Sequence, residues 1–495
     1  MPYLLIFIFF QIITLSASAQ EIGEIKGLVL DADKKEALPY TNIVVLHKEF
    51  GTISNEKGFF VLDIEHLNST DTLSFQYVGY KTQNICISDM DSTTTIYLKE
   101  EIINLSEAFV FSNPPKAKAI VKKVIENKSE NYKTISCKSQ AFVRERNSSD
   151  IDYLKIQYKK NDIPELNEGV IKTIERKIPK HNISYTDFLG QVYSSNLFED
   201  SIKIKATKVI SLKSEDVSEL NQIGKVFEKL FKNTKTKEYW KVKSGIVSQK
   251  LKINDDNEST EEDSIKDEMS YRTETYYLKQ NIKRTMEFAS MDDDDDWEFL
   301  YQTGSYEYTL VGGTRINAED VYIIDFSPKN GGKFIGRLYI SINTYALIRA
   351  DYKYDTDKKG TDIHLFGVGY TSNYFEGSIF FEHKNENYVL KYLSKKTGNI
   401  VSINRPVSLI KKRERFLFDK ELSEIKVKFN YKVRIINSAE ILIINRQPIL
   451  KSQFDKIKEQ KYTKIVLVNQ FDANLWKGYS IIEPTQQMKD YKKVD

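Results

Sequence analysis

Residues 58–82 have the sequence GFFVLDIEHLNSTDTLSFQYVGYKT, which predicts one strand, a polar turn and a second strand. The second strand ends in an aromatic–glycine–aromatic group, Tyr77-Val78-Gly79-Tyr80. Short runs of the same kind fill the flanking sequence, among them EIKGLVLDA, YTNIVVL and TTIYL. Several short strands at this close spacing predict a small β-sandwich.

The rest of the chain is also predicted to be mainly β. Tyr (30) and Phe (27) are frequent, whereas Gly (21) and Pro (10) are few, which favours strands. In LIRADYKY, residues 347–354, apolar and charged side chains alternate as in a half-buried antiparallel strand. We therefore predict a large, curved, half-barrel-like antiparallel sheet with a few helices.

Two helices interrupt this pattern. KAKAIVKKVIENK follows Pro114-Pro115 and has apolar residues at helical spacing, so it predicts an amphipathic helix. A second helix is expected to begin at Ser214, a suitable N-cap. The predicted division is a signal peptide (1–19), a β-sandwich (20–100), a linker with the amphipathic helix (101–135), a β-rich domain (136–435) and a C-terminal segment (436–495).

The first residues predict export. An apolar run from Leu4 to about Ile13 precedes Ala17-Ser18-Ala19, the small-residue pattern of a signal-peptide cleavage site. An uncleaved anchor is the alternative, because the run has no preceding Lys or Arg. No later apolar stretch is long enough for a transmembrane helix. A lipoprotein is not expected, because no Cys lies near the cleavage point. We expect a periplasmic or outer-membrane-associated protein.

The net charge and the sequence motifs do not indicate nucleic-acid binding or a known class of enzyme. The formal net charge of +3 is too small to indicate nucleic-acid binding. Only two cysteines, Cys86 and Cys137, are present, and both are expected to be small core residues. A disulfide bond between them is the alternative. The sequence has no G-x-S-x-G elbow and no P-loop. A catalytic triad assembled by tertiary folding would have no sequence support.

Four further features have the composition of possible sites. His383 and Glu386 have H-x-x-E spacing, but no later His completes a zinc site, so an exposed turn is expected. The aspartates at 292–296 lack the alternating spacing of a calcium loop, and Lys411-Lys412-Arg413 is expected to be a solvated face. Aromatic side chains at strand spacing favour core over a glycan platform. We assign no catalytic, cofactor or metal residue.

Four motifs in order near the N-terminus closely resemble the carboxypeptidase-like regulatory domain of Bacteroidetes envelope proteins. They are GLVLD (27–31), LPYTNIVV (38–45), GTISNEKGFF (51–60) and LSFQYVGY (73–80). The resemblance implies a prealbumin-like seven-stranded β-sandwich without catalytic residues. It also makes Tyr77-Val78-Gly79-Tyr80 a marker of the fold, in which the glycine permits a bend. The residue types agree with it, because Asn55 and Gly58 suit turn positions of positive φ.

The strand order of the remainder is similar to that of the half-barrel of lipoprotein-carrier proteins. That similarity implies a concave apolar sheet able to hold a lipid or a protein segment; the alternative is a sheet covered by its own helix. The expectation is a non-enzymatic exported envelope protein whose partner is another envelope protein, a lipid or a glycan. The alternatives are an outer-membrane β-barrel or TonB-receptor-related component, and a hydrolase with a discontinuous site.

Overall fold

The structure is a computed structural model that describes residues 23–48, 50–101, 116–133, 135–195, 202–213, 231, 237–245, 247–251, 270–316, 319–329 and 331–491. The chain divides into two compact units. The first contains the chain up to Tyr77, Lys81–Lys99 and Ala473–Glu483, and the second contains the remainder. Among the described residues, no helix is both long enough and apolar enough to cross a membrane. The predicted signal peptide lies outside the described residues.

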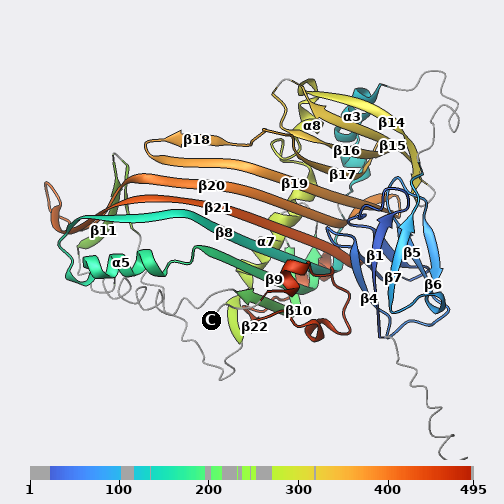
Figure 1. Ribbon diagram of the computed structural model, residues 1–495, viewed down its shortest axis with the longest axis horizontal. Coiled ribbons are helices and arrows are strands. Elements are labelled where there is room, and N and C mark those ends of the chain that lie inside the picture. The colour runs from blue at the N-terminus through green and yellow to red at the C-terminus, as the bar shows by residue number, and fades with distance from the viewer. Residues whose placement is uncertain are drawn as a thin grey trace, which may run out of the picture. The chain divides into compact units, whose positions relative to one another are not determined.

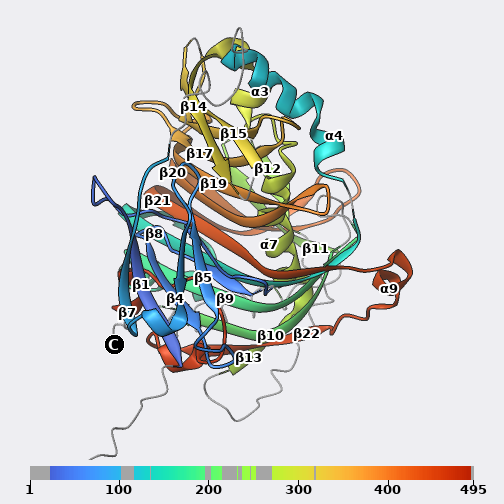
Figure 2. The same ribbon diagram turned by 90° about the vertical axis from the view of Figure 1, so that its right-hand side faces the viewer.

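The first unit is a seven-stranded β-sandwich, as predicted (Figure 2). One sheet has the order β4-β1-β7 and the other has the order β3-β2-β5-β6. Phe60 and Phe75 join the two sheets through an edge-to-face contact with ring centroids 5.6 Å apart. The strands are β1 (Glu24–Asp31), β2 (Asn42–Val45), β3 (Gly51–Ile53), β4 (Phe59–Asp63), β5 (Thr72–Gln76), β6 (Gln83–Cys86) and β7 (Thr93–Leu98).

The turn between β3 and β4 is organised by Asn55, although not in the way the sequence suggested. Gly58 has a φ of 78°, but Asn55 is not among the residues of positive φ. Its side-chain oxygen instead accepts hydrogen bonds from the backbone N–H of Lys57 (2.9 Å) and Phe59 (3.1 Å). Asparagine suits such a turn because its short side chain reaches its own backbone two residues on.

The same turn binds the C-terminal part of this unit. The Asn55 side-chain amide donates to the carbonyl of Glu483 (3.1 Å), and the Thr52 hydroxyl donates to the carbonyl of Ile481 (3.0 Å). All four residues are buried. Residues 473–483 therefore belong to the sandwich despite their distance in sequence, a contact that the sequence did not predict.

The Tyr77-Val78-Gly79-Tyr80 group follows β5 and contains a sharp bend. Gly79 has a φ of 89°, a conformation that favours glycine. Its carbonyl accepts a hydrogen bond from the backbone N–H of Glu101 (2.8 Å). Residues 78–80 are grouped with the second unit, so the chain crosses from one unit to the other at this bend and returns at Lys81.

The second unit is built on one large sheet that is antiparallel apart from the parallel pair β10–β22 (Figure 1). Its described strands follow the order β13-β22-β10-β9-β8-β21-β20-β19-β17-β16-β15-β14, with β11 paired to β20 and β12, and β18 paired to β19. The strands are β8 (Cys137–Asn161), β9 (His181–Ser194), β10 (Ile202–Lys213), β11 (Glu238–Ser244), β12 (Val247–Lys250), β13 (Ser270–Glu274), β14 (Tyr306–Ile316), β15 (Glu319–Pro328), β16 (Phe334–Ser341), β17 (Leu347–Tyr354), β18 (Asp362–Leu365), β19 (Val368–Lys384), β20 (Asn387–Arg413), β21 (Lys420–Pro448) and β22 (Tyr462–Val468).

The structure differs from the predicted division at residue 436. That position lies inside β21, which pairs with β20 on one side and β8 on the other. Polar residues such as Asn437 and Ser438 weaken the apolar pattern there, yet the strand continues because neighbours on both sides satisfy its backbone.

Short helices pack on this sheet. The predicted amphipathic helix is α3 (Ala117–Glu126), which buries Ala117, Ile120, Val121 and Val124. α7 (Thr275–Glu287) packs against β10, β13 and β21 (Figure 2). The other described helices are α4 (Lys128–Asn131), α5 (Glu168–Lys177), α8 (Glu298–Tyr301), α9 (Lys451–Lys456) and α10 (Gln486–Lys489). The helix predicted from Ser214 lies outside the described residues, apart from Phe231 at its predicted end.

Candidate binding surface

The long strands of the second unit extend well beyond the part of the sheet that α3, α7 and α8 cover (Figure 1). We call this extension the arm. It comprises residues 149–177, 237–245, 247–251, 362–372 and 399–435. The hairpin of β20 and β21 is its longest part, because these strands have 27 and 29 residues.

The register of the strands sorts the side chains of the arm onto two faces. Residues directly opposite each other on neighbouring strands point to the same face of a sheet. One row across five strands is Ile363, Tyr370, Val401, Val433 and Ile151. The row beside it is Leu365, Val368, Ile403, Tyr431 and Leu154. This face of the arm is therefore apolar from β18 to β8.

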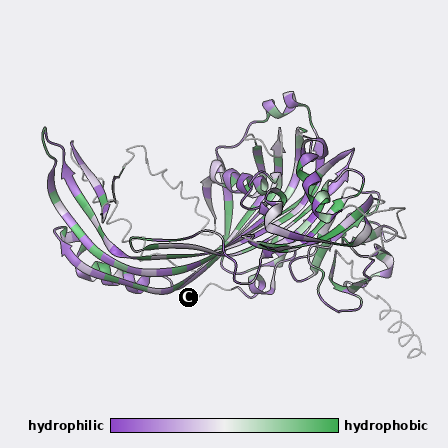
Figure 3. Ribbon diagram, turned by 90° about the horizontal axis from the view of Figure 1, so that it is seen from above, coloured by the Kyte–Doolittle hydropathy of each residue, from purple (hydrophilic) through white to green (hydrophobic). Residues whose placement is uncertain are grey.

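The opposite face is polar and carries many charges. One of its rows is His364, Gly369, Ser402, Lys432 and Tyr153. Asp152 contacts both Arg434 (2.7 Å) and Lys432 (3.4 Å), and these ion pairs lie at the surface. Figure 3 shows the resulting alternation of hydrophilic and hydrophobic residues along the arm strands. The arm is thus an amphipathic sheet.

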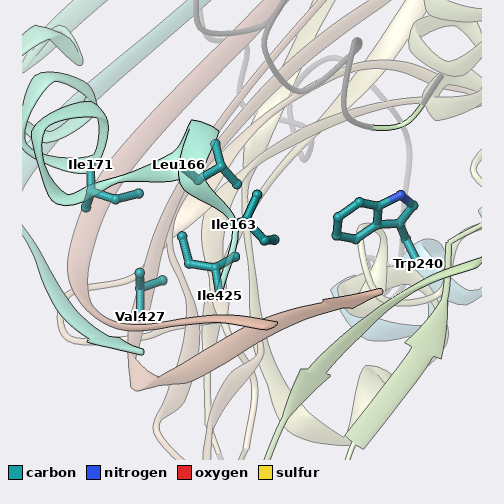
Figure 4. Packing of buried hydrophobic residues seen from close by; sticks show 6 residues of the cluster. All are labelled: Ile163, Leu166, Ile171, Trp240, Ile425 and Val427. Carbon is teal, nitrogen blue, oxygen red and sulfur yellow. The ribbon is translucent and has the colours of Figure 1, made fainter. Parts of the chain in front are cut away.

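α5 covers part of the apolar face near the end of the arm. Asn167 caps the helix by accepting a hydrogen bond from the backbone N–H of Val170 (3.1 Å). The helix and the turn before it contribute Ile171, Ile163 and Leu166 to a buried cluster, where Ile425 and Val427 of β21 and Trp240 of β11 complete the packing (Figure 4). Trp240 is only 1% exposed.

Beyond this cluster, four large side chains of the same face are exposed at β18 and β19. Ile363 is 57% exposed, Leu365 59%, Val368 39% and Tyr370 41%. Val401 and Ile403 of β20 continue this surface and are half-buried. We call these six residues the arm patch. Neighbouring large apolar side chains exposed on one sheet face are typical of a binding surface, whereas single ones need no explanation.

The aspartates at 292–296, which the sequence did not favour as a calcium site, form ion pairs and a turn. Asp292 pairs with Lys128 and Asp296 pairs with Lys395, while Asp295 lies 3.4 Å from Lys333. The Asp293 side chain accepts hydrogen bonds from the backbone N–H of Asp295 (2.9 Å) and Asp296 (3.2 Å), as in a turn. Among the described residues, no group of His, Cys, Asp or Glu side chains has the arrangement of a metal site.

This acidic loop closes an aromatic core. Trp297, which follows the loop, is fully buried and donates its ring N–H to the carbonyl of Phe288 (3.0 Å). Tyr352 donates its hydroxyl to the carbonyl of Asp296 (2.9 Å), and its ring stacks on Phe375. Burial raises the pKa of the Asp296 carboxyl, and the charge of Lys395 opposes that shift. The loop therefore holds the covered part of the sheet together.

The other residues that the sequence offered as possible sites are not part of the arm patch. His383 stacks on Tyr388, and Asn385 and Glu386 (φ 51° and 60°) form the tight turn between β19 and β20. Lys411 and Arg413 pair with Glu238 of β11. Cys86 is half-buried and Cys137 is buried, and both are free.

Sequence reasoning missed one buried ion pair in the same sheet. Arg144 of β8 and Asp187 of β9 lie directly opposite each other and form two hydrogen bonds, of 2.8 and 2.7 Å. Their side chains are 5% and 0% exposed. Two charged residues in strands separated by many others carry no signal of pairing until the register is known.

The match to a protein-family model concerns the sandwich. Residues 25–110 match the CarboxypepD_reg-like domain. The sandwich is a CarboxypepD_reg-like domain. Its match ends near the boundary of the first unit, and the CarboxypepD_reg-like domain does not include the arm. No curated protein sequence matches the chain.

Several solved structures show weak likeness to the chain. A MucA/MucB complex of Pseudomonas aeruginosa is 7% identical and covers 68% of this chain and 99% of that one, with a TM-score of 0.17. A LolA superfamily protein of Nitrosomonas europaea is 9% identical and covers 69% of this chain and 98% of that one, also with a TM-score of 0.17. A DUF1329 family protein of Desulfovibrio piger is 10% identical and covers 69% and 98%, with a TM-score of 0.18. These TM-scores are too low for any transfer of function.

Proposed function

We propose that this protein is an exported, non-enzymatic binding protein of the cell envelope, and that the arm patch binds an acyl chain of a lipid. The observation that carries this proposal is the exposure of Ile363, Leu365, Val368 and Tyr370 on one face of neighbouring strands. Export is supported by the apolar N-terminal run with Ala17-Ser18-Ala19, and a mature N-terminus at Gln20 would test it directly.

The chemistry of the patch suits an acyl chain. Its members are aliphatic except for one tyrosine, so they offer apolar area with little demand for hydrogen bonding. α5 covers Val427 and Ile425, which lie further along β21 on the same face as the patch. A sugar would need several polar side chains placed around it, and a glycan therefore fits this surface less well.

Displacement of a fluorescent fatty acid from the purified protein tests the proposal. The Ile363→Ser and Leu365→Ser double variant removes the two most exposed aliphatic side chains of the patch. The matched control is His364→Ser, since His364 lies between them on the opposite, polar face of β18. We expect weaker binding only in the double variant.

The magnitude follows from the exposed area. Full burial of a leucine or isoleucine contributes about 1.5–3 kcal/mol, and each side chain is a little over half exposed, so the two together contribute about 2–3 kcal/mol. That corresponds to an increase of about 30- to 150-fold in Kd. Equal affinity in the double variant and in His364→Ser, or no binding by the wild type, would reject the proposal.

A further inference from the structure

The turn between β20 and β21, residues 414–419, exposes three consecutive large apolar side chains. Phe416 is 102% exposed, Leu417 79% and Phe418 86%. They lie at the far end of the longest hairpin of the arm (Figure 1). Folding leaves these side chains fully in water, which is unfavourable unless a second phase or partner takes them up.

Basic residues surround this apolar turn. Between positions 411 and 420, the basic residues are Lys411, Lys412, Arg413, Arg415 and Lys420, and the acidic ones are Glu414 and Asp419. Glu238 of β11 pairs with Lys411 and Arg413. Both acidic side chains of the turn are already engaged, Glu414 by Lys250 (2.7 Å) and Asp419 by the Tyr239 hydroxyl. Within the described part of the chain, no carboxylate lies within ion-pair distance of Arg415 or Lys420. The turn therefore presents three apolar side chains together with the positive charges of Arg415 and Lys420.

A protruding turn of this kind suits a bilayer better than a folded protein partner. The roughly 1,000 Å² of a stable protein interface counts both partners, and two aromatic side chains of about 150–250 Å² each with one leucine reach only about one side of the smallest such interface. Insertion into a bilayer needs no complementary shape. Phenylalanine and leucine enter the acyl boundary readily, while lysine and arginine extend toward anionic headgroups.

We propose that residues 414–419 dock this protein on an anionic phospholipid bilayer, with Phe416, Leu417 and Phe418 inserted among the acyl chains. The basic residues on either side, above all Arg415 and Lys420, then contact the headgroup phosphates. This surface is separate from the arm patch, because β20 continues for ten residues beyond Ile403, where β19 begins to pair. The two proposals can therefore fail independently.

Flotation of the full chain with vesicles tests the docking. The vesicles are phosphatidylcholine alone, or phosphatidylcholine with phosphatidylglycerol as the minority lipid. We expect the wild type to float with the anionic vesicles, and the Phe416→Ser, Leu417→Ser and Phe418→Ser triple variant to lose about tenfold or more in the bound fraction. The control variant replaces three exposed apolar residues elsewhere, Tyr276, Tyr277 and Leu450, with serine.

Two further measurements separate insertion from adsorption. Arg415→Gln with Lys420→Gln should weaken binding to the anionic vesicles, with little effect on the neutral ones. The tryptophan of a Phe416→Trp variant should be quenched by lipids brominated in their acyl chains.

Three results would overturn the proposal: a wild type that does not float with anionic vesicles, a triple variant that floats as well as the control, or an unquenched tryptophan. Cross-linking through this turn that yields only a protein adduct or a second copy of the chain would assign the surface to that partner instead. Because Ile363→Ser and Leu365→Ser leave the turn intact, that variant should still float even if it no longer displaces a fatty acid.

Discussion

Removing one partner of the Arg144–Asp187 pair is expected to destabilise the large sheet strongly. Arg144→Met leaves the Asp187 carboxylate buried without its partner, because Asp187 is 0% exposed and the two side chains share two hydrogen bonds. Loss of one member of such a buried pair costs about 3–5 kcal/mol. Asp187→Leu should also destabilise the sheet, since it removes the carboxylate that accepts both hydrogen bonds from the guanidinium.

The double variant separates the two possible reasons for this cost. Replacement of both partners by apolar residues of similar size is often neutral or stabilising, because the desolvation of both charges is avoided. We therefore expect Arg144→Met with Asp187→Leu to recover most of the lost stability. Glu440 lies opposite Arg144 on the other side of β8. Its carboxylate accepts a hydrogen bond from the Tyr392 hydroxyl (2.9 Å), which the double variant leaves in place.

The chain supplies a matched control and a local reporter. Arg434→Met removes an arginine of the same sheet that pairs with Asp152 at 2.7 Å, but its side chain is 56% exposed, so the cost should be below about 1 kcal/mol. Urea unfolding followed by tryptophan fluorescence reports on this unit through Trp240 and Trp297, which are 1% and 0% exposed, while Trp476 reports on the first unit. An Arg144→Met variant no less stable than Arg434→Met would refute the reasoning.

Three more predictions address the bend, the turn and a buried acid. Gly79→Val forces a branched side chain to a φ of 89°, which should cost about 1–3 kcal/mol, and an unchanged melting temperature would contradict this. Asn55→Ala removes three hydrogen bonds and should make residues 473–483 sensitive to limited proteolysis, whereas Thr52→Ser, which keeps its hydroxyl, should not. Burial raises the pKa of Glu145, against a hydrogen bond from Asn281 and the charge of Arg284. A raised folded pKa means that the unfolding free energy falls as pH rises from about 4.3, the ordinary value of a glutamate, through the folded value, so Glu145→Gln should flatten urea-unfolding midpoints measured across that range.

The parts of the fold that local sequence determines were predicted well. The sandwich strands and their turns depend on alternation and turn residues within about ten positions, and α3 depends on apolar spacing within ten residues. The alternation of LIRADYKY is confirmed in β17, although Arg349 is 2% exposed because its guanidinium pairs with Asp351 (2.7 Å). Pairing allows a charged residue to be buried on a face that its type marks as exposed.

The candidate surfaces could not be predicted because they depend on register. Ile363 and Ile151 lie in the same row of the arm, yet more than two hundred residues separate them in sequence. No local pattern specifies which residue of β8 faces which residue of β21. The exposure of Phe416, Leu417 and Phe418 could not be predicted for a similar reason. Three apolar residues between charged ones resemble the end of a buried strand, and only the structure shows that this hairpin ends in solvent.

The place of β8 in the sheet has a consequence for how this chain folds. β8 begins at Cys137, but one of its two neighbours, β21, begins only at Lys420, and the sandwich likewise receives residues 473–483 last. Contacts of such long sequence separation form slowly, because the entropy of closing the loop must be lost first. During synthesis, β8 therefore remains a strand with one open edge until nearly the whole polypeptide has emerged. A holdase that shields exposed strand edges should speed its maturation, and truncation of the last residues should leave both units incomplete.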